Sequence, residues 1–203
     1  ANAWNSLGVA LTDLGNLKGA MDAYLKAIEC DPDFIEPYFN SHTALIDLGK
    51  TGEAISMLEK AALLEPSNPV YSFFQGMVQE FLVDSKLGRE MIEGLAKNTD
   101  VQAEIESWEH LKSLNLKTAI LAGTNTKTID LALKQATLNG LILEFGVYNG
   151  KSIRNIAALV DSTVYGFDSF QGIPENWNDE PSGSYSANGN LPEVPSNVSL
   201  FQG

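Results

Sequence analysis

Two acidic residues and two glycines in the last third of the chain could form a ligand site. Glu144 stands two residues before Gly146, Gly150 follows four residues later, and Asp168 ends the next apolar segment. Glycines let a backbone turn tightly and approach a ligand closely. A helix that starts at such a turn offers free N–H groups and the positive end of its dipole. The turn and the helix start therefore predict a binding site for an anionic group.

A strand, a turn and a helix must position these residues. The mostly aliphatic run 141–145 predicts a strand that is buried on both faces. Apolar residues recur at helical spacing within 151–160, and a second strand is expected at 163–167. In such a unit the turn lies at the carboxyl end of the first strand, where Asp168 also ends the second.

The spacing of the turn argues against two nucleotide-binding motifs. A P-loop has four residues between its first glycine and its Gly-Lys-Ser, whereas GVYNGKS has only Val147, Tyr148 and Asn149 there. A dinucleotide fingerprint needs a glycine where Tyr148 stands, because the pyrophosphate touches the backbone at that point. What remains is Glu-x-Gly-x-x-x-Gly with an acid at the end of the next strand.

This pattern resembles motif I and the acid after the second strand of class I S-adenosylmethionine-dependent methyltransferases. Two longer segments, LEFGVYNGKS from Leu143 and GFDSFQGIPENW from Gly166, are similar in order and spacing to the macrocin-type O-methyltransferase family. The resemblance covers about residues 124–203. It implies that this segment is the N-terminal half of an α/β Rossmann-like methyltransferase domain.

The resemblance also implies a site for S-adenosylmethionine. Its expected residues are Glu144, Gly146, Val147, Tyr148, Gly150, Ser152, Asp168 and Ser169. The turn backbone would pass the methionine part of the cofactor, and Ser152 would donate to its carboxylate. Asp168 would accept hydrogen bonds from the two ribose hydroxyls, unless it only caps a helix or a turn. Glu144 would orient the turn or the cofactor's ammonium group, unless local N–H groups satisfy it.

The implied reaction is O-methylation of a sugar or a sugar-containing small molecule at a hydroxyl group. The protein would position the two reactants, exclude water and help to remove the hydroxyl proton. In the resembled family a divalent metal such as Mg²⁺ assists that step, and its ligands would lie beyond residue 203. The catalytic base is therefore unknown from this chain, and the 203 residues alone are expected to be inactive.

The segment 169–197 is rich in Gly, Pro, Asn and Ser and is too long for a plain connector. We expect it to be a lid or a partly mobile loop. Trp177 and Tyr185 could cover the cofactor and shape the acceptor pocket. A strand-like segment follows it.

The first third of the chain repeats itself. ALTDLGNLKGA (10–20) and ALIDLGKTGEA (44–54) align at an offset of 34 residues. This period and the positions of aromatic residues, glycine, alanine and proline are typical of the tetratricopeptide repeat, a pair of helices. Gly15 and Gly49 should end the first helices. The apolar stripe that the second helix is expected to cover consists of Trp4, Leu7, Leu11 and Leu14.

The predicted fold is an α-helical tetratricopeptide solenoid followed by the partial methyltransferase domain. The expected parts are two repeats, a divergent third repeat or capping pair, a helical linker and the methyltransferase segment, at 1–34, 35–68, 69–100, 101–123 and 124–203. The linker helix should run to Leu116. The next helix should run from a cap at Asn125 or Thr126 to about Leu138 and end in left-handed geometry at Asn139-Gly140.

Stacked repeats present a concave surface built from their first helices. Its expected residues are Asn2, Asn5, Val9, Thr12, Asp13, Glu36, Phe39, Thr43, Ile46 and Asp47. This surface is either a solvated face or a groove for a protein or peptide partner. A groove would be acidic and partly apolar, so its ligand should be basic or neutral.

Composition excludes several classes of function. The net charge of −13 argues against nucleic-acid binding, because a phosphate backbone needs a basic face. The single cysteine, Cys30, and the absence of a leader or a bilayer-spanning apolar run lead us to expect a cytoplasmic protein without a membrane role. No partner near His42 or His110 suggests a metal site. The first residue is Ala, so we expect an excerpt of a longer protein.

Two hypotheses follow. The leading one is an S-adenosylmethionine-dependent methyltransferase that carries a tetratricopeptide module for protein interaction. The alternative is a scaffold whose repeats bind protein and whose carboxyl-terminal domain is methyltransferase-like but not catalytic.

Overall fold

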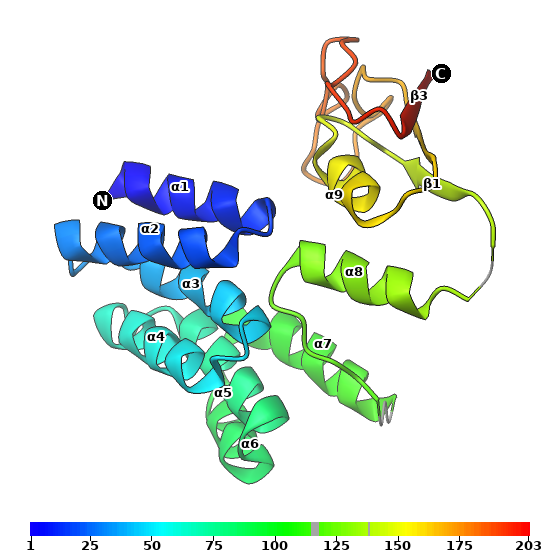
Figure 1. The fold of residues 1–203 in the computed structure, drawn as a ribbon. Coiled ribbons are helices and arrows are strands. Elements are labelled where there is room, and N and C mark those ends of the chain that lie inside the picture. Colours follow the sequence, from blue (N-terminus) through cyan, green and yellow to red (C-terminus); the bar gives the residue numbers. More distant parts are fainter. Residues whose placement is uncertain (115–117, 138) are drawn as a thin grey trace. The chain divides into compact units, whose positions relative to one another are not determined.

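The computed structural model describes residues 1–114, 118–137 and 139–203, and the chain divides into two compact units, 1–127 and 128–203 (Figure 1). The first unit is helical. The second contains a small parallel sheet. No helix among the described residues is both long enough and apolar enough to cross a membrane.

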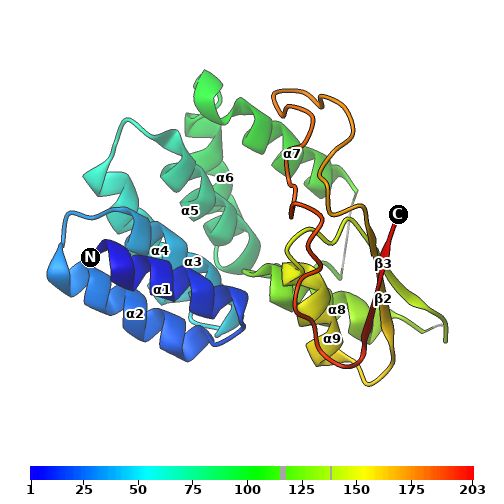
Figure 2. The same ribbon diagram turned by 90° about the horizontal axis from the view of Figure 1, so that it is seen from above.

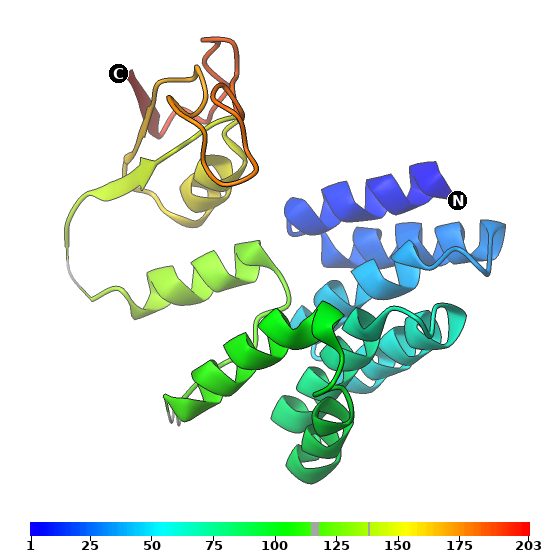
Figure 3. The ribbon, with the colours of Figure 1, turned by 180° about the vertical axis from the view of Figure 1, so that it is seen from behind.

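The repeats form successive pairs of packed helices (Figure 1). Their bounds are α1 (Asn2–Asp13), α2 (Leu17–Cys30), α3 (Glu36–Asp47), α4 (Thr51–Leu64), α5 (Pro69–Leu82) and α6 (Ser85–Gly94). Each pair also packs on the next, so the elements stack in chain order. Figure 3 shows the same stack from behind, with α5 and α6 at its far end. A helix pair, α5 and α6, thus occupies the segment 69–100 where a divergent repeat or capping pair is expected.

Glycine follows the end of the first helix in the first two helix pairs, as predicted. α1 and α3 stop two residues before Gly15 and Gly49, whose φ angles are +74° and +73°. A side chain is disfavoured at such angles, because its Cβ meets the backbone. The next helix then begins, in the first repeat with Asn16 accepting a hydrogen bond from the Gly19 N–H at 3.1 Å.

The predicted stripe on α1 is wrong for three of its residues. Trp4, Leu7 and Leu14 are exposed, whereas Gly8 is buried against the ring of Tyr24. α1 packs mainly on α2 and on α3, and these three apolar side chains lie largely outside these contacts. The close contact with α2 is made by small residues, because they let the two backbones approach.

The third pair packs closely through Gly88. A Cβ at Gly88 would lie 2.1 Å from the backbone nitrogen of Glu80, so α6 crosses α5 at backbone contact. Glu80 itself is buried and accepts hydrogen bonds from Trp108 Nε1 at 2.8 Å and from Lys112 Nζ at 3.0 Å. Burial alone would raise the pKa of Glu80, but these donors and the nearby charge of Arg89 outweigh it and hold the pKa below its ordinary value.

The segment after the third pair joins the core of the first unit. A short 3₁₀ turn, η1 (Thr99–Val101), leads into α7 (Gln102–Ser113). Val101, Ile105 and Trp108 share a buried apolar cluster with residues of α5 and α6. The expected linker thus begins as a packed part of the repeat unit. Its predicted end at Leu116 lies outside the described residues.

The helix before the sheet differs from the prediction at both ends. α8 (Asn125–Gln135) is capped by Thr124, whose Oγ1 accepts the Lys127 N–H at 3.1 Å, one residue before the predicted caps. The helix ends at Gln135, and Leu138 lies outside the described residues. Gly140 does not have the expected left-handed φ, because the helix has already ended and no terminal turn is needed there.

The second unit holds a three-stranded parallel sheet in the order β1-β2-β3 among the described residues. Its elements are β1 (Ile142–Phe145), α9 (Lys151–Leu159), β2 (Val164–Asp168) and β3 (Val198–Gln202). Figure 2 shows α9 lying against one face of this sheet. The core on that face consists of Val147, Ile153, Ala157, Val164 and Phe170.

The expected burial of β1 on both faces is wrong. Leu143 is 43% exposed and Phe145 is 75% exposed, because α9 covers only the face that carries Ile142 and Glu144. On the exposed face the rings of Phe145, Phe167 and Phe201 stack across the strands with centroids 5.2 and 5.1 Å apart. The sheet therefore has one packed face and one aromatic face.

Candidate functional site

The two predicted acids lie on the same side of the sheet. Glu144 pairs in register with Gly166, and side chains two residues apart in a strand share a face, so Asp168 points to the side of Glu144. Both residues are at the carboxyl ends of neighbouring parallel strands. This is the edge at which open α/β sheets bind ligands.

One oxygen of Glu144 is left without a hydrogen-bond partner. Ser152 donates to Oε1 at 2.5 Å, while Oε2 is buried and has no partner among the described residues. Burial raises the pKa of Glu144 above its ordinary value, and the hydrogen bond from Ser152 opposes that shift in part. A buried carboxylate oxygen without a donor is costly, so this atom can accept a hydrogen bond from a ligand.

Asp168 holds the two loops that follow β1 and β2. Its Oδ2 accepts the Tyr148 N–H and its Oδ1 accepts the Phe170 N–H, both at 2.7 Å. Each carboxylate oxygen has two lone-pair directions, so Asp168 can still accept hydroxyl donors. The bond from Phe170 is the turn cap that the sequence left open as an alternative role for Asp168, whereas the bond from Tyr148 was not predicted.

The two glycines of the turn have the positive φ angles that their type favours, and Tyr148 between them has one too. Gly146, Tyr148 and Gly150 have φ angles of +86°, +50° and +78°. The Gly146 N–H also donates to the Phe167 carbonyl at 2.9 Å, which ties the start of the turn to β2. A Cβ at Gly150 would lie 2.9 Å from Arg154 Nη1, the movable end of a side chain, so it is mainly the φ angle that favours glycine here. Both glycines of the pattern are thus required by geometry.

Two other predicted residues have local roles. Val147 is buried in the core of the second unit, so only its backbone can face a ligand. The Ser169 hydroxyl accepts the Gln171 N–H at 3.2 Å and lies within reach of the Gly172 carbonyl. Gly150 has no side chain to cap α9, but Asn149 Oδ1 accepts the Lys151 N–H at 3.2 Å at the start of this helix. The positive end of the helix dipole still lies beside the glycine turn.

The long segment after β2 is folded back on Phe170, which the sequence did not single out. The N–H groups of Ala187 and Gly189 donate to the Phe170 carbonyl at 3.1 and 2.8 Å, and the Phe170 side chain is fully buried. Tyr185 lies edge-on against Tyr148, with ring centroids 6.1 Å apart. The segment thus reaches the glycine turn. Trp177, the other expected cover residue, is exposed.

No cluster of His, Cys, Asp and Glu that could hold a metal ion occurs among the described residues. The two acids place hydrogen-bond acceptors at the carboxyl ends of β1 and β2, beside the glycine turn. Carboxylates at this edge can accept hydrogen bonds from donors of a ligand.

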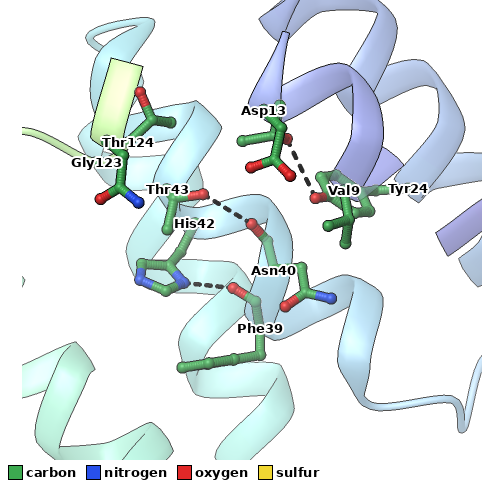
Figure 4. Close-up of a pocket in the computed structure, with 11 residues that line it drawn as sticks. Val9, Asp13, Tyr24, Phe39, Asn40, His42, Thr43, Gly123 and Thr124 are labelled. Atoms are coloured by element: carbon green, nitrogen blue, oxygen red, sulfur yellow. Dashed lines mark hydrogen bonds between the residues drawn. The ribbon is translucent and has the colours of Figure 1, made fainter. Parts of the chain in front are cut away.

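A second candidate site lies in the first unit, on the concave side of the repeats (Figure 4). A cavity of about 230 Å³, here called the repeat cavity, is lined by Val9, Thr12, Asp13, Tyr24, Phe39, Asn40, His42, Thr43, Gly123, Thr124 and Asn125. Five of these residues, Val9, Thr12, Asp13, Phe39 and Thr43, are in the predicted concave set. The sequence therefore predicted one side of the cavity but did not predict that residues 123–125 line its other side.

Asp47 binds the segment 123–125 directly. Its Oδ1 accepts the Gly123 N–H at 2.7 Å, and its Oδ2 accepts the Thr124 N–H at 3.0 Å and the Thr124 hydroxyl at 2.7 Å. All three donors are neutral. A carboxylate that accepts this many hydrogen bonds from one segment fixes the position of that segment.

Comparison with known proteins identifies the repeats. Family models described as tetratricopeptide repeat match residues 1–34 and 37–68. Over 66 residues the chain is also 33% identical to Protein FlbA of Caulobacter vibrioides, a match that covers 32% of this chain and 11% of that protein. The chain thus corresponds to a small part of that relative. Residues 1–68 are tetratricopeptide repeats, and such repeats support a role in protein interaction.

Proposed function

We propose that residues 124–203 bind S-adenosylmethionine as part of an O-methyltransferase that acts on a sugar or a sugar-containing small molecule. The tetratricopeptide module would bring a protein or peptide partner to this enzyme. The observation that carries the proposal is the pair of acids, Glu144 and Asp168, on one side of two neighbouring parallel strands beside the glycine turn. The motifs that resemble the macrocin-type family support it further.

The residues present fit the proposed cofactor. Glu144 Oε2 is a buried acceptor without a donor, which suits an ammonium or hydroxyl group of the ligand. Asp168 retains acceptor capacity at the end of β2, which suits the ribose hydroxyls. The helix start after Gly150 suits the ligand's carboxylate. The bound cofactor would supply a methyl group activated by its sulfonium.

The chain's own residues would prepare the transfer by positioning. Asp168 joins the loops that start at Tyr148 and Phe170, so a ligand bound at this acid is held by both loops. The contact between Tyr148 and Tyr185 places aromatic surface over the glycine turn, which would help to exclude water. Alignment of donor and acceptor accounts for much of the rate of a displacement reaction.

Isothermal titration calorimetry of the protein with S-adenosylmethionine tests the proposal. Asp168→Asn should weaken binding by roughly 10- to 100-fold, because a charged acceptor contributes about 1.5–3 kcal/mol and each 1.4 kcal/mol is tenfold. Asp161→Asn is the matched control, because Asp161 is exposed before β2 and undergoes the same change of charge. Thermal melting of each variant separates lost binding from lost folding. Absence of binding by the unaltered protein would refute the proposal.

One observation favours the alternative, a scaffold with a non-catalytic methyltransferase-like domain. Both oxygens of Asp168 already accept backbone N–H groups, so this acid has a structural role without any ligand. On this account the protein does not bind S-adenosylmethionine, and Asp168→Asn lowers only the melting temperature. The same calorimetry and melting data therefore distinguish the two functions.

A further inference from the structure

The concave side of the repeats is already in contact with a later part of the same chain. Residues 121–126, here called the docked segment, belong to the first unit. Leu121 packs on the apolar cluster that contains Leu45 and Ile46 of α3. Two residues later the segment reaches the carboxylate of Asp47, which accepts three hydrogen bonds from it. An apolar contact followed by backbone hydrogen bonds is a common way for a repeat surface to hold a peptide.

Only glycine fits at the centre of the docked segment. A Cβ at Gly123 would lie 1.9 Å from the carbonyl oxygen of Thr43 and 3.0 Å from its Cα. Both are backbone atoms of α3, so the helix cannot yield by turning a side chain. The contact therefore selects glycine at this position of a ligand.

Both repeats contact the segment at equivalent positions. Asp13 and Asp47 are 34 residues apart and occupy the same place in the two copies. The Thr126 hydroxyl donates to the backbone carbonyl oxygen of Asp13 at 3.3 Å. The side-chain carboxylate of Asp47 accepts the N–H groups of Gly123 and Thr124. The docked segment thus follows the two first helices in turn, as a bound peptide would.

We propose that residues 121–126 are an internal ligand of the tetratricopeptide surface and compete there with a partner protein. The partner would carry the same short pattern: an apolar residue, a small residue, glycine, and then threonine or serine at the start of a helix. Asp47 would accept two backbone N–H groups and the hydroxyl of that motif. This inference rests on the role of the repeats in protein interaction. It does not depend on the methyltransferase assignment.

The chemistry of the surface limits the partner further. Asp13 and Asp47 make the surface acidic, so a motif that brings a carboxylate to this point would be repelled. All three donors to Asp47 are neutral, so the motif needs no basic side chain. The partner is therefore a neutral glycine-threonine or glycine-serine segment rather than a free carboxyl terminus.

A synthetic peptide with the sequence of residues 118–127, TAILAGTNTK, provides the probe. Its binding to the full chain is measured by fluorescence anisotropy. In the unaltered protein the tethered segment competes at an effective concentration on the order of 1 mM. The variant Gly123→Ala should release the segment and strengthen peptide binding by roughly tenfold or more. Gly140→Ala is the matched control, because a Cβ at Gly140 meets no atom of the described residues within 4 Å.

Replacing glycine by alanine should strengthen peptide binding when it is made at Gly123 of the protein and abolish binding when it is made in the peptide. A peptide with alanine in place of its glycine should not bind to either protein, because its Cβ meets the Thr43 carbonyl. Adding Asp47→Asn to Gly123→Ala should abolish binding of the original peptide. Equal binding of the peptide to the unaltered protein and to the Gly123→Ala variant, or no binding to both, would overturn the proposal.

Hydrogen exchange gives a second readout that needs no peptide. The amide protons of Gly123 and Thr124 should exchange slowly in the unaltered protein and at least about tenfold faster after Asp47→Asn. Thr124→Ala keeps both N–H groups and loses only the hydroxyl contact, so its effect should be smaller. Unchanged exchange in the Asp47→Asn variant, with the helices intact by circular dichroism, would contradict the docked segment.

Discussion

His42 lies on the repeat cavity with its ring enclosed by aromatic neighbours. The ring is 4.9 Å from that of Phe39 and 5.5 Å from that of Phe74, and its Nδ1 donates to the Phe39 carbonyl. Burial lowers the pKa of His42 below its ordinary value, and the hydrogen bond to Phe39 opposes that shift in part. The folded protein therefore favours the neutral ring.

This burial makes stability depend on pH. Between the ordinary pKa of 6.5 and the lower folded pKa, the unfolded chain binds a proton that the folded chain excludes. The contribution of the neutral His42 ring to stability should thus be fully present above pH 6.5. Below that pH the free energy of unfolding should fall by up to about 1.4 kcal/mol per pH unit. Urea denaturation of the protein and of His42→Asn at pH 8 and pH 5 checks this.

The His42→Asn variant should lose that pH dependence, because asparagine does not titrate. His110→Asn is the control, since His110 is an exposed residue of α7. Glu80 does not interfere, because its lowered pKa places its loss of stabilisation below pH 4.5. If His42→Asn kept the full difference between pH 8 and pH 5, the buried neutral ring would not be its source.

At the scale of the elements, the crossing of α5 and α6 depends on one glycine. A Cβ at Gly88 would lie 2.1 Å from the Glu80 nitrogen and 2.5 Å from the Gly76 carbonyl oxygen. Gly88→Ala should lower the free energy of unfolding by about 3 kcal/mol, because backbone atoms have to move apart. Gly94→Ala, in the last turn of the same helix, has nothing within 4 Å of its new Cβ and should change stability by less than about 1 kcal/mol.

Urea denaturation followed by helical circular dichroism measures both variants. Equal stability of Gly88→Ala and Gly94→Ala would show that the two helices are not packed at backbone contact. The comparison isolates the packing effect, because both changes add the same methyl group to α6.

The repeat helices could be predicted from sequence because their signals are local. The 34-residue offset, the left-handed glycines and the prolines after the second helices mark each element within a few residues. The exposure of Trp4 and Leu7 could not be predicted, because it depends on which helices surround α1. The hydrogen bond between Asp47 and Gly123 joins positions 76 residues apart, so no local sequence pattern predicts it.

The candidate cofactor site was predictable to a similar extent. Strand direction alone places Glu144 and Asp168 together, because parallel strands end at the same edge of a sheet. The turn-cap bond from Phe170 to Asp168 was left open as an alternative, while the bonds from Ser152 to Glu144 and from Tyr148 to Asp168 were not predicted. They depend on loop backbone angles, such as the positive φ of Tyr148, that residue type does not determine.

At the scale of the whole molecule, the chain combines a repeat unit, 1–127, with a sheet unit, 128–203. The first carries a surface for a protein segment and the second a pair of acids beside a glycine turn. The net charge of −13 makes anionic partners unfavourable for the molecule as a whole. We therefore expect a neutral peptide motif at the repeats and a cofactor with a cationic sulfonium at the sheet.

The most direct test of the cofactor assignment is a crystal structure of the protein with S-adenosylhomocysteine. We predict density for the ligand at the carboxyl ends of β1 and β2, with the ribose hydroxyls within hydrogen-bond distance of Asp168 and a ligand donor at Glu144 Oε2. Density for the ligand elsewhere, or a ligand-free turn at saturating concentration with Asp168 bonded only to Tyr148 and Phe170, would contradict the assignment.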